Sequence, residues 1–194
     1  MPRTWGTLAT LSGTITIFLR DVLDDGLGAN WDPLACVGGD YNRFAAFESG
    51  KLVVNVPAGN NWGKTGIMSK KPLFTVDNTM DARPMKIVLD FVPSRTTGYV
   101  NALAPVQHVD VWVTQNSGDR SDPKEDKDMS EQAPARVTLA VKAGAVTAEL
   151  SDKSFTPYPS WLKSGTPVYL HIFSHPEGAG GPASFALDAV TVGR

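Results

Sequence analysis

Cysteine, net charge and long apolar runs are all scarce in this sequence, and each scarcity removes a class of protein. The single cysteine, Cys36, excludes an internal disulfide. With a formal net charge of -2 and 20% charged residues, the chain lacks the strong positive field typical of nucleic-acid-binding proteins. No run approaches the roughly 18 consecutive apolar residues of a membrane span. The sequence also contains no Gly-x-Gly-x-x-Gly, P-loop, Gly-x-Ser-x-Gly or His-x-Glu-x-x-His motif.

The N-terminal 19 residues have some features of a weak signal peptide. An early Arg3 precedes a mostly apolar stretch, but threonine, serine and glycine interrupt it, and no small-x-small cleavage site precedes Asp21. We therefore predict a first strand region there. An extracellular role would then need a separate secretion route, or release by lysis as for a phage particle.

Alternation of apolar and polar residues is the dominant pattern of the sequence. It predicts strands at 14–19, 51–56, 65–69, 85–92, 109–114, 168–173 and 185–192, and a hairpin over 135–150. The 18 glycines and 14 prolines lie between these runs as turn residues, and one short helical turn is predicted near 160–162. The pattern indicates one all-β domain over 1–194, an antiparallel two-sheet β-sandwich. The polar stretch 115–134 is predicted to be either a mobile solvated loop or a loop over a site.

Three segments, in order, carry a resemblance to a known group of proteins. The acidic segment 20–31 ends in Asn30-Trp31, the run 47–54 contains Ser49-Gly50-Lys51-Leu52, and 66–74 begins Gly66-Ile67-Met68-Ser69-Lys70. With the closing apolar strand 185–190, this order resembles the concanavalin-like jelly-roll group, which includes laminarinase-type glycoside hydrolases and related carbohydrate-binding modules. The resemblance implies a concanavalin-like jelly roll and a polysaccharide or glycan as partner.

The catalytic signature of the resembled hydrolases is missing. Their central strand carries Glu-x-Asp-x-x-Glu, which this sequence does not contain. Retaining hydrolysis needs two carboxyl groups about 5–5.5 Å apart, and residues 109–113 offer only Asp110. We therefore predict a protein that is not an enzyme.

Tryptophans in polar surroundings are the candidate sugar-binding residues, because flat rings stack on sugars while amides and carboxylates bind the hydroxyls. Trp62 follows Asn61 in a predicted loop, and Trp112 lies on a strand with Asp110 and Thr114. The carbohydrate-binding prediction is Trp62, Asn61, Asp110 and Trp112. The alternative for both rings is packing in the protein.

The resemblance also implies a structural calcium ion. In the resembled group an aspartate on the closing strand helps to hold Ca²⁺, and Asp188 is predicted to share a strand face with Ala186, Val190 and Val192. Calcium takes six to eight oxygen ligands, which Asp21, Asp24 and Asp25 would help to supply. The alternative is a carboxylate bonded to backbone N–H groups or facing water.

Three functions follow from these patterns. The first is a lectin-like, non-catalytic carbohydrate-binding module on a cell surface, in a secreted assembly or on a virion. The second is a structural β-sandwich, such as a phage-like spike or fibre component, that makes protein–protein contacts in a homo-oligomer or larger assembly. The third is a glycan-active enzyme with an unrecognised site.

Overall fold

The computed structural model describes most of the chain. The described residues are 7–10, 13–24, 26–36, 38–59, 63–96, 99–103, 111–114, 136–142, 145–150, 153–155, 163–175 and 182–194. The predicted loop 115–134 and the predicted helical turn at 160–162 lie outside these residues. Among the described helices, none has the length and apolar character needed to cross a membrane.

The larger of the two main sheets has nine strands. Its main path runs β1 (Thr7–Thr10), β2 (Gly13–Asp21), β16 (Ala183–Gly193), β8 (Met85–Phe91), β11 (Arg136–Lys142), β12 (Ala145–Leu150) and β13 (Lys153–Phe155). β5 (Lys51–Val56) pairs with β16 and with β4 (Ala45–Glu48). All pairings are antiparallel, and the predicted hairpin forms with Leu139 opposite Ala148.

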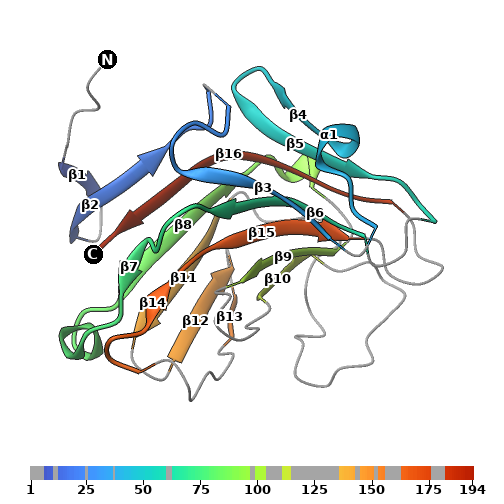
Figure 1. Cartoon of the computed structure of the whole chain (residues 1–194). Helices are drawn as coiled ribbons and strands as arrows, with labels where there is room; N and C mark the ends of the chain where they lie inside the picture. The colour runs from blue at the N-terminus through green and yellow to red at the C-terminus, as the bar shows by residue number, and fades with distance from the viewer. Residues whose placement is uncertain are drawn as a thin grey trace.

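The second sheet has five strands and lies in front of the first in Figure 1. From top to bottom these are β3 (Trp31–Cys36), β6 (Lys64–Ser69), β15 (His171–His175), β9 (Tyr99–Leu103) and β10 (Val111–Thr114). A small third sheet pairs β7 (Phe74–Thr75) with β14 (Pro167–Val168). The described helices are short: α1 (Tyr41–Phe44), η1 (Asn78–Asp81) and η2 (Pro93–Arg95). This arrangement confirms the predicted antiparallel two-sheet sandwich.

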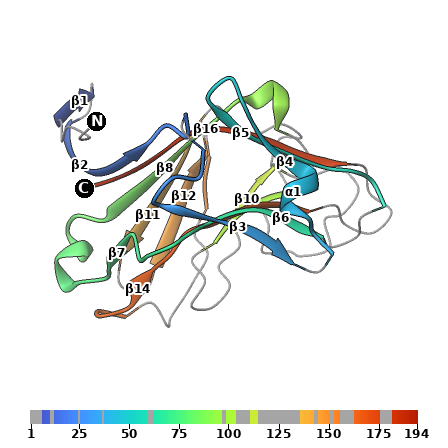
Figure 2. The same cartoon turned by 45° about the horizontal axis from the view of Figure 1, so that its top comes forward.

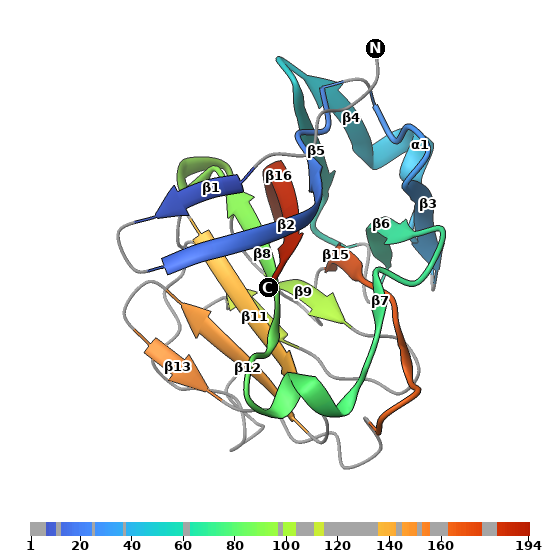
Figure 3. The same cartoon turned by 90° about the vertical axis from the view of Figure 1, so that its left-hand side faces the viewer.

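The hydrophobic core fills the space between the two main sheets. β8 buries every second residue, as alternation predicts for a strand with one face on a core. One cluster joins Leu52, Ile87 and Leu89 of the nine-stranded sheet to Trp31, Ile67 and Ile172 of the five-stranded sheet. Figure 3 shows the two sheets from the side, with β8, β11 and β12 opposite β3, β6 and β15. The face of the five-stranded sheet that points away from this core is called the outer face below.

The long strand β16 departs from regular alternation at Asp188. Leu187 pairs with Phe91 and Ala189 pairs with Asp90, so Asp188 is an extra residue opposite β8. Phe185 and Leu187 lie in the core before this bulge, and Val190 and Val192 lie in it afterwards. The prediction that Asp188 shares a face with Val190 and Val192 is therefore wrong, because the extra residue reverses the alternation.

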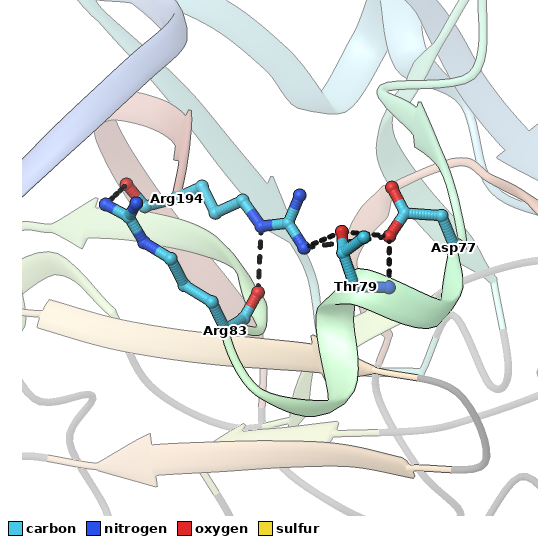
Figure 4. Close-up of polar contacts among 4 residues, drawn as sticks. All are labelled: Asp77, Thr79, Arg83 and Arg194. Carbon is cyan, nitrogen blue, oxygen red and sulfur yellow. Dashed lines mark hydrogen bonds and ion pairs between the residues drawn. The ribbon is translucent and has the colours of Figure 1, made fainter.

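The C-terminal end of β16 is tied to its neighbours on two sides. Arg194 exchanges backbone hydrogen bonds with Thr16 of β2, which runs beside β16 in Figure 2. Its guanidinium donates to the Arg83 carbonyl oxygen at 2.9 Å and to the Thr79 hydroxyl, while the Arg83 guanidinium donates back to the Arg194 carbonyl oxygen at 3.0 Å (Figure 4). The connection between β7 and β8 is thereby fixed to the end of the last strand.

Candidate functional site: the outer face of the five-stranded sheet

One row of residues crosses all five strands on the outer face by register. Leu34 pairs with Gly66, Gly66 with Phe173, Phe173 with Asn101, and Asn101 with Trp112. Leu34 and Phe173 form a small buried cluster with Met68, separate from the main core. Residues that oppose each other directly share a sheet face. Because Leu34 and Phe173 do not belong to the main core, their row lies on the outer face of the sheet.

Gly66 is the smallest member of this row. A β-carbon at position 66 would overlap the carbonyl oxygen of Ile172 on β15. Glycine inside a strand often marks the close approach of another backbone or of a ligand. Here it lets β6 and β15 come together and leaves no side chain between Leu34 and Phe173.

A second row on the same face is more polar. Asp32 pairs with Met68, and Met68 pairs with His171. The Lys70 ammonium lies 3.4 Å from the Asp32 carboxylate and donates to the Gly28 carbonyl oxygen at 3.3 Å. The ammonium of Lys70 therefore compensates the negative charge of Asp32.

The four predicted sugar-binding residues are only partly covered by the structure. Asn61, Trp62 and Asp110 lie outside the described residues. Trp112 lies on β10, opposite Asn101, with an irregular register between Trp112 and Thr114. The strand pairing thus places Trp112 at the end of the Leu34–Gly66–Phe173 row. Alternation within one strand does not reveal this position, because it says nothing of the neighbouring strands.

Carboxylates are thinly distributed over the described strands. Among the five strands of the smaller sheet only Asp32 is acidic, and no described strand of either main sheet carries two acids. A pair of carboxylates on alternate residues of one strand therefore does not occur in the described strands. On the outer side of the larger sheet, Asp90 pairs with Arg136 at 2.6 Å, and this hydrogen bond raises the pKa of Arg136.

Asp21 belongs to a buried hydrogen-bond cluster. Its side chain is 3% exposed, and one oxygen accepts from the Leu23 amide at 3.1 Å. The other oxygen accepts from the Asn30 side-chain amide at 2.5 Å and the Trp31 indole N–H at 3.1 Å. Both carboxylate oxygens thus satisfy protein donors where the chain crosses from β2 to β3.

The predicted calcium ligands do not come together. Asp21 opposes Val190 on the core face, whereas Asp188 forms an ion pair with Lys51 and is about half exposed. Asp24 is exposed, and Asp25 lies outside the described residues. The described part of the chain contains no group of three or more His, Cys, Asp or Glu side chains that could hold a metal. These residues do not fit a calcium site, and calcium binding stays a prediction.

The cation that sequence reasoning missed is Lys64. Its ammonium lies 5.0 Å from the centroid of the Phe173 ring, within the range of a cation–π interaction. Alternation on β6 and β15 could have placed both residues on the outer face. The register that brings them together is visible only in the folded chain.

Comparisons with known proteins support the architecture. No protein-family model matches the chain, and no curated protein does. Among solved structures, LamAcat from Zobellia galactanivorans superposes with a TM-score of 0.58 at 12% identity, over 92% of this chain and 97% of that one. Bacillus licheniformis β-glucanase gives 0.53 at 10% identity, over 91% and 97%. A Clostridium perfringens endo-β-galactosidase that releases GlcNAcα1-4Gal gives 0.52 at 13% identity, over 98% and 66%. The chain therefore has the concanavalin-like jelly-roll fold that its sequence predicts.

Proposed function

We propose that this protein is a non-catalytic carbohydrate-binding module that holds a polysaccharide on the outer face of its five-stranded sheet. The observation that carries the proposal is the distribution of carboxylates. As far as the structure describes them, the strands of this sheet contain a single acid, Asp32, which pairs with Lys70, whereas retaining hydrolysis needs two acids about 5–5.5 Å apart.

The choice of carbohydrate as ligand rests on the fold and on the sequence pattern. Two of the similar structures, a β-glucanase and an endo-β-galactosidase, are named for action on glycans. The row ending at Trp112 runs across the sheet and combines apolar and polar positions, as sugar recognition requires. Asn61, Trp62 and Asp110 complete the proposed set.

The proposed setting is extracellular: a cell surface, a secreted assembly or a virion. Several copies on one particle would offset weak binding at each site, because linked sites raise the effective concentration. A homo-oligomer or larger assembly fits this use.

The test combines a glycan array with a sugar-release assay on the same polysaccharides. The proposal predicts binding without release of reducing sugar, and loss of binding in Trp112→Ala and Trp62→Ala with an unchanged melting temperature. Phe18→Ala is the matched control, since Phe18 is an exposed aromatic (43%) on β2 of the other sheet. Sugar release that disappears in Asp110→Asn would replace the proposal with an enzyme. Binding of no glycan, with a stable oligomer in light scattering, would favour a structural protein.

A further inference from the structure

Lys64 and Phe173 form a positively charged position on the outer face. The ammonium lies over the ring at 5.0 Å, and the ring itself is only 1% exposed. Phe173 is therefore not open for stacking against a sugar. Lys64 is half-buried, so its side chain is the part of this pair that solvent or a ligand can reach.

Among the residues that the structure describes, no acid compensates the charge of Lys64. No carboxylate among the residues that the structure describes lies within ion-pair distance of Lys64, whereas Lys70 on the same side has Asp32 at 3.4 Å. The Phe173 ring attracts the ammonium through its quadrupole but carries no net charge. Lys64 keeps donors with which to bind an anion.

The surroundings of Lys64 also favour an anion. The five strands contain one acid, and its charge is balanced by Lys70. Among the described residues of these strands and Lys70, two lysines, Lys64 and Lys70, stand against one acid, Asp32; Asp110 lies outside the described residues.

We propose that Lys64 binds an acidic group of an anionic polysaccharide on the outer face. This inference rests on the proposed function and narrows it to one class of glycan. The acidic group is a carboxylate, as in a uronic acid, or a sulfate ester. Both accept charge-assisted hydrogen bonds from an ammonium.

The experiment is affinity electrophoresis of the full chain through gels that contain polygalacturonate, dextran sulfate, dextran or laminarin. The proposal predicts retardation by an acidic polymer, weakened by added salt. Lys64→Met should weaken this binding about tenfold or more, since hydrogen bonds to charged groups are worth about 1.5–3 kcal/mol. Retardation by polygalacturonate alone assigns a carboxylate, and retardation by dextran sulfate alone assigns a sulfate.

Two further variants control the experiment. Lys86→Met removes another half-buried lysine, on β8 of the other sheet, and should leave binding unchanged. Lys64→Arg keeps the charge and should retain most of the binding, which separates loss of charge from loss of fold. Binding of neutral glycans alone, or equal binding by Lys64→Met, would overturn this inference and leave the proposed function standing. Retardation by none of the polymers, together with an array that shows no bound glycan, would overturn both.

Discussion

Replacement of Asp21 by alanine tests the hydrogen-bond cluster that joins the two sheets. The Leu23 amide and the Trp31 indole N–H are buried and both donate to this carboxylate. A buried donor left without a partner costs about 1–3 kcal/mol. The third donor, on Asn30, is only partly buried and can turn to water.

Taking about 1.5 kcal/mol for each of the two buried donors, Asp21→Ala should lower the free energy of unfolding by about 3 kcal/mol. For a chain of this size that corresponds to a fall in melting temperature of about 6–12 °C. Asp21→Asn keeps one acceptor oxygen and should lose less. The assay is urea unfolding followed by tryptophan fluorescence, with thermal melting as a second measurement.

Asp188→Asn is the control for this experiment. Its ion pair with Lys51 is about half exposed, and exposed pairs contribute about 0–1 kcal/mol. A free energy of unfolding of Asp21→Ala within about 1 kcal/mol of that of the unmodified protein would contradict this role of Asp21.

Four other outcomes are expected. Gly66→Ala should prevent stable folding, because its β-carbon would overlap the Ile172 carbonyl oxygen; a soluble variant with the normal melting temperature would contradict the close approach. Tyr41→Phe should leave stability unchanged or raise it, since the Tyr41 hydroxyl is buried without a hydrogen-bond partner among the described residues and burial raises the pKa of Tyr41; a loss above about 1 kcal/mol in urea unfolding would show that the hydroxyl has a partner. The hydrogen bond from Thr79 lowers the pKa of Asp77 below its ordinary value of 3.8, so the carboxylate stabilises the fold above that pH and ceases to do so as the pH falls through its lowered folded-state pKa. Asp77→Asn should therefore flatten the loss of stability in that acid range, and an identical pH profile would argue against it. The described acids predicted as calcium ligands do not form one site, so these residues predict an equal melting temperature in EDTA and in calcium chloride; a lower melting temperature in EDTA would support the calcium prediction through other ligands.

The strands of the fold were predictable because apolar and polar residues alternate along a strand that has one face on the core. Met85–Phe91 and the hairpin of β11 and β12 follow the sequence pattern almost residue by residue. The same rule fails at Asp188, since an extra residue in a bulge reverses the alternation and leaves no mark in the local sequence. The rule also fails for the predicted strand 168–173, which the structure divides into two strands: β14 ends at Val168, and β15 begins at His171.

The candidate site was harder to predict than the fold. Its described residues come from all five strands of the smaller sheet, and their proximity depends on register between strands far apart in the chain. Asp21 shows the same limit at short range. Its partners Asn30 and Trp31 are close in sequence, yet their burial beneath the sheets decides that this acid accepts hydrogen bonds within the protein.

Binding of a glycan to the outer face of the five-stranded sheet can be measured directly. The most direct measurement is an NMR titration of the isotope-labelled protein with an oligosaccharide of the polymer that retards it best. We expect amide shift changes concentrated on the five strands of the smaller sheet, with the largest around Lys64 on β6 and Trp112 on β10. Changes confined to β2, β8 and β11 on the larger sheet, or no changes at saturating ligand, would contradict binding at this face.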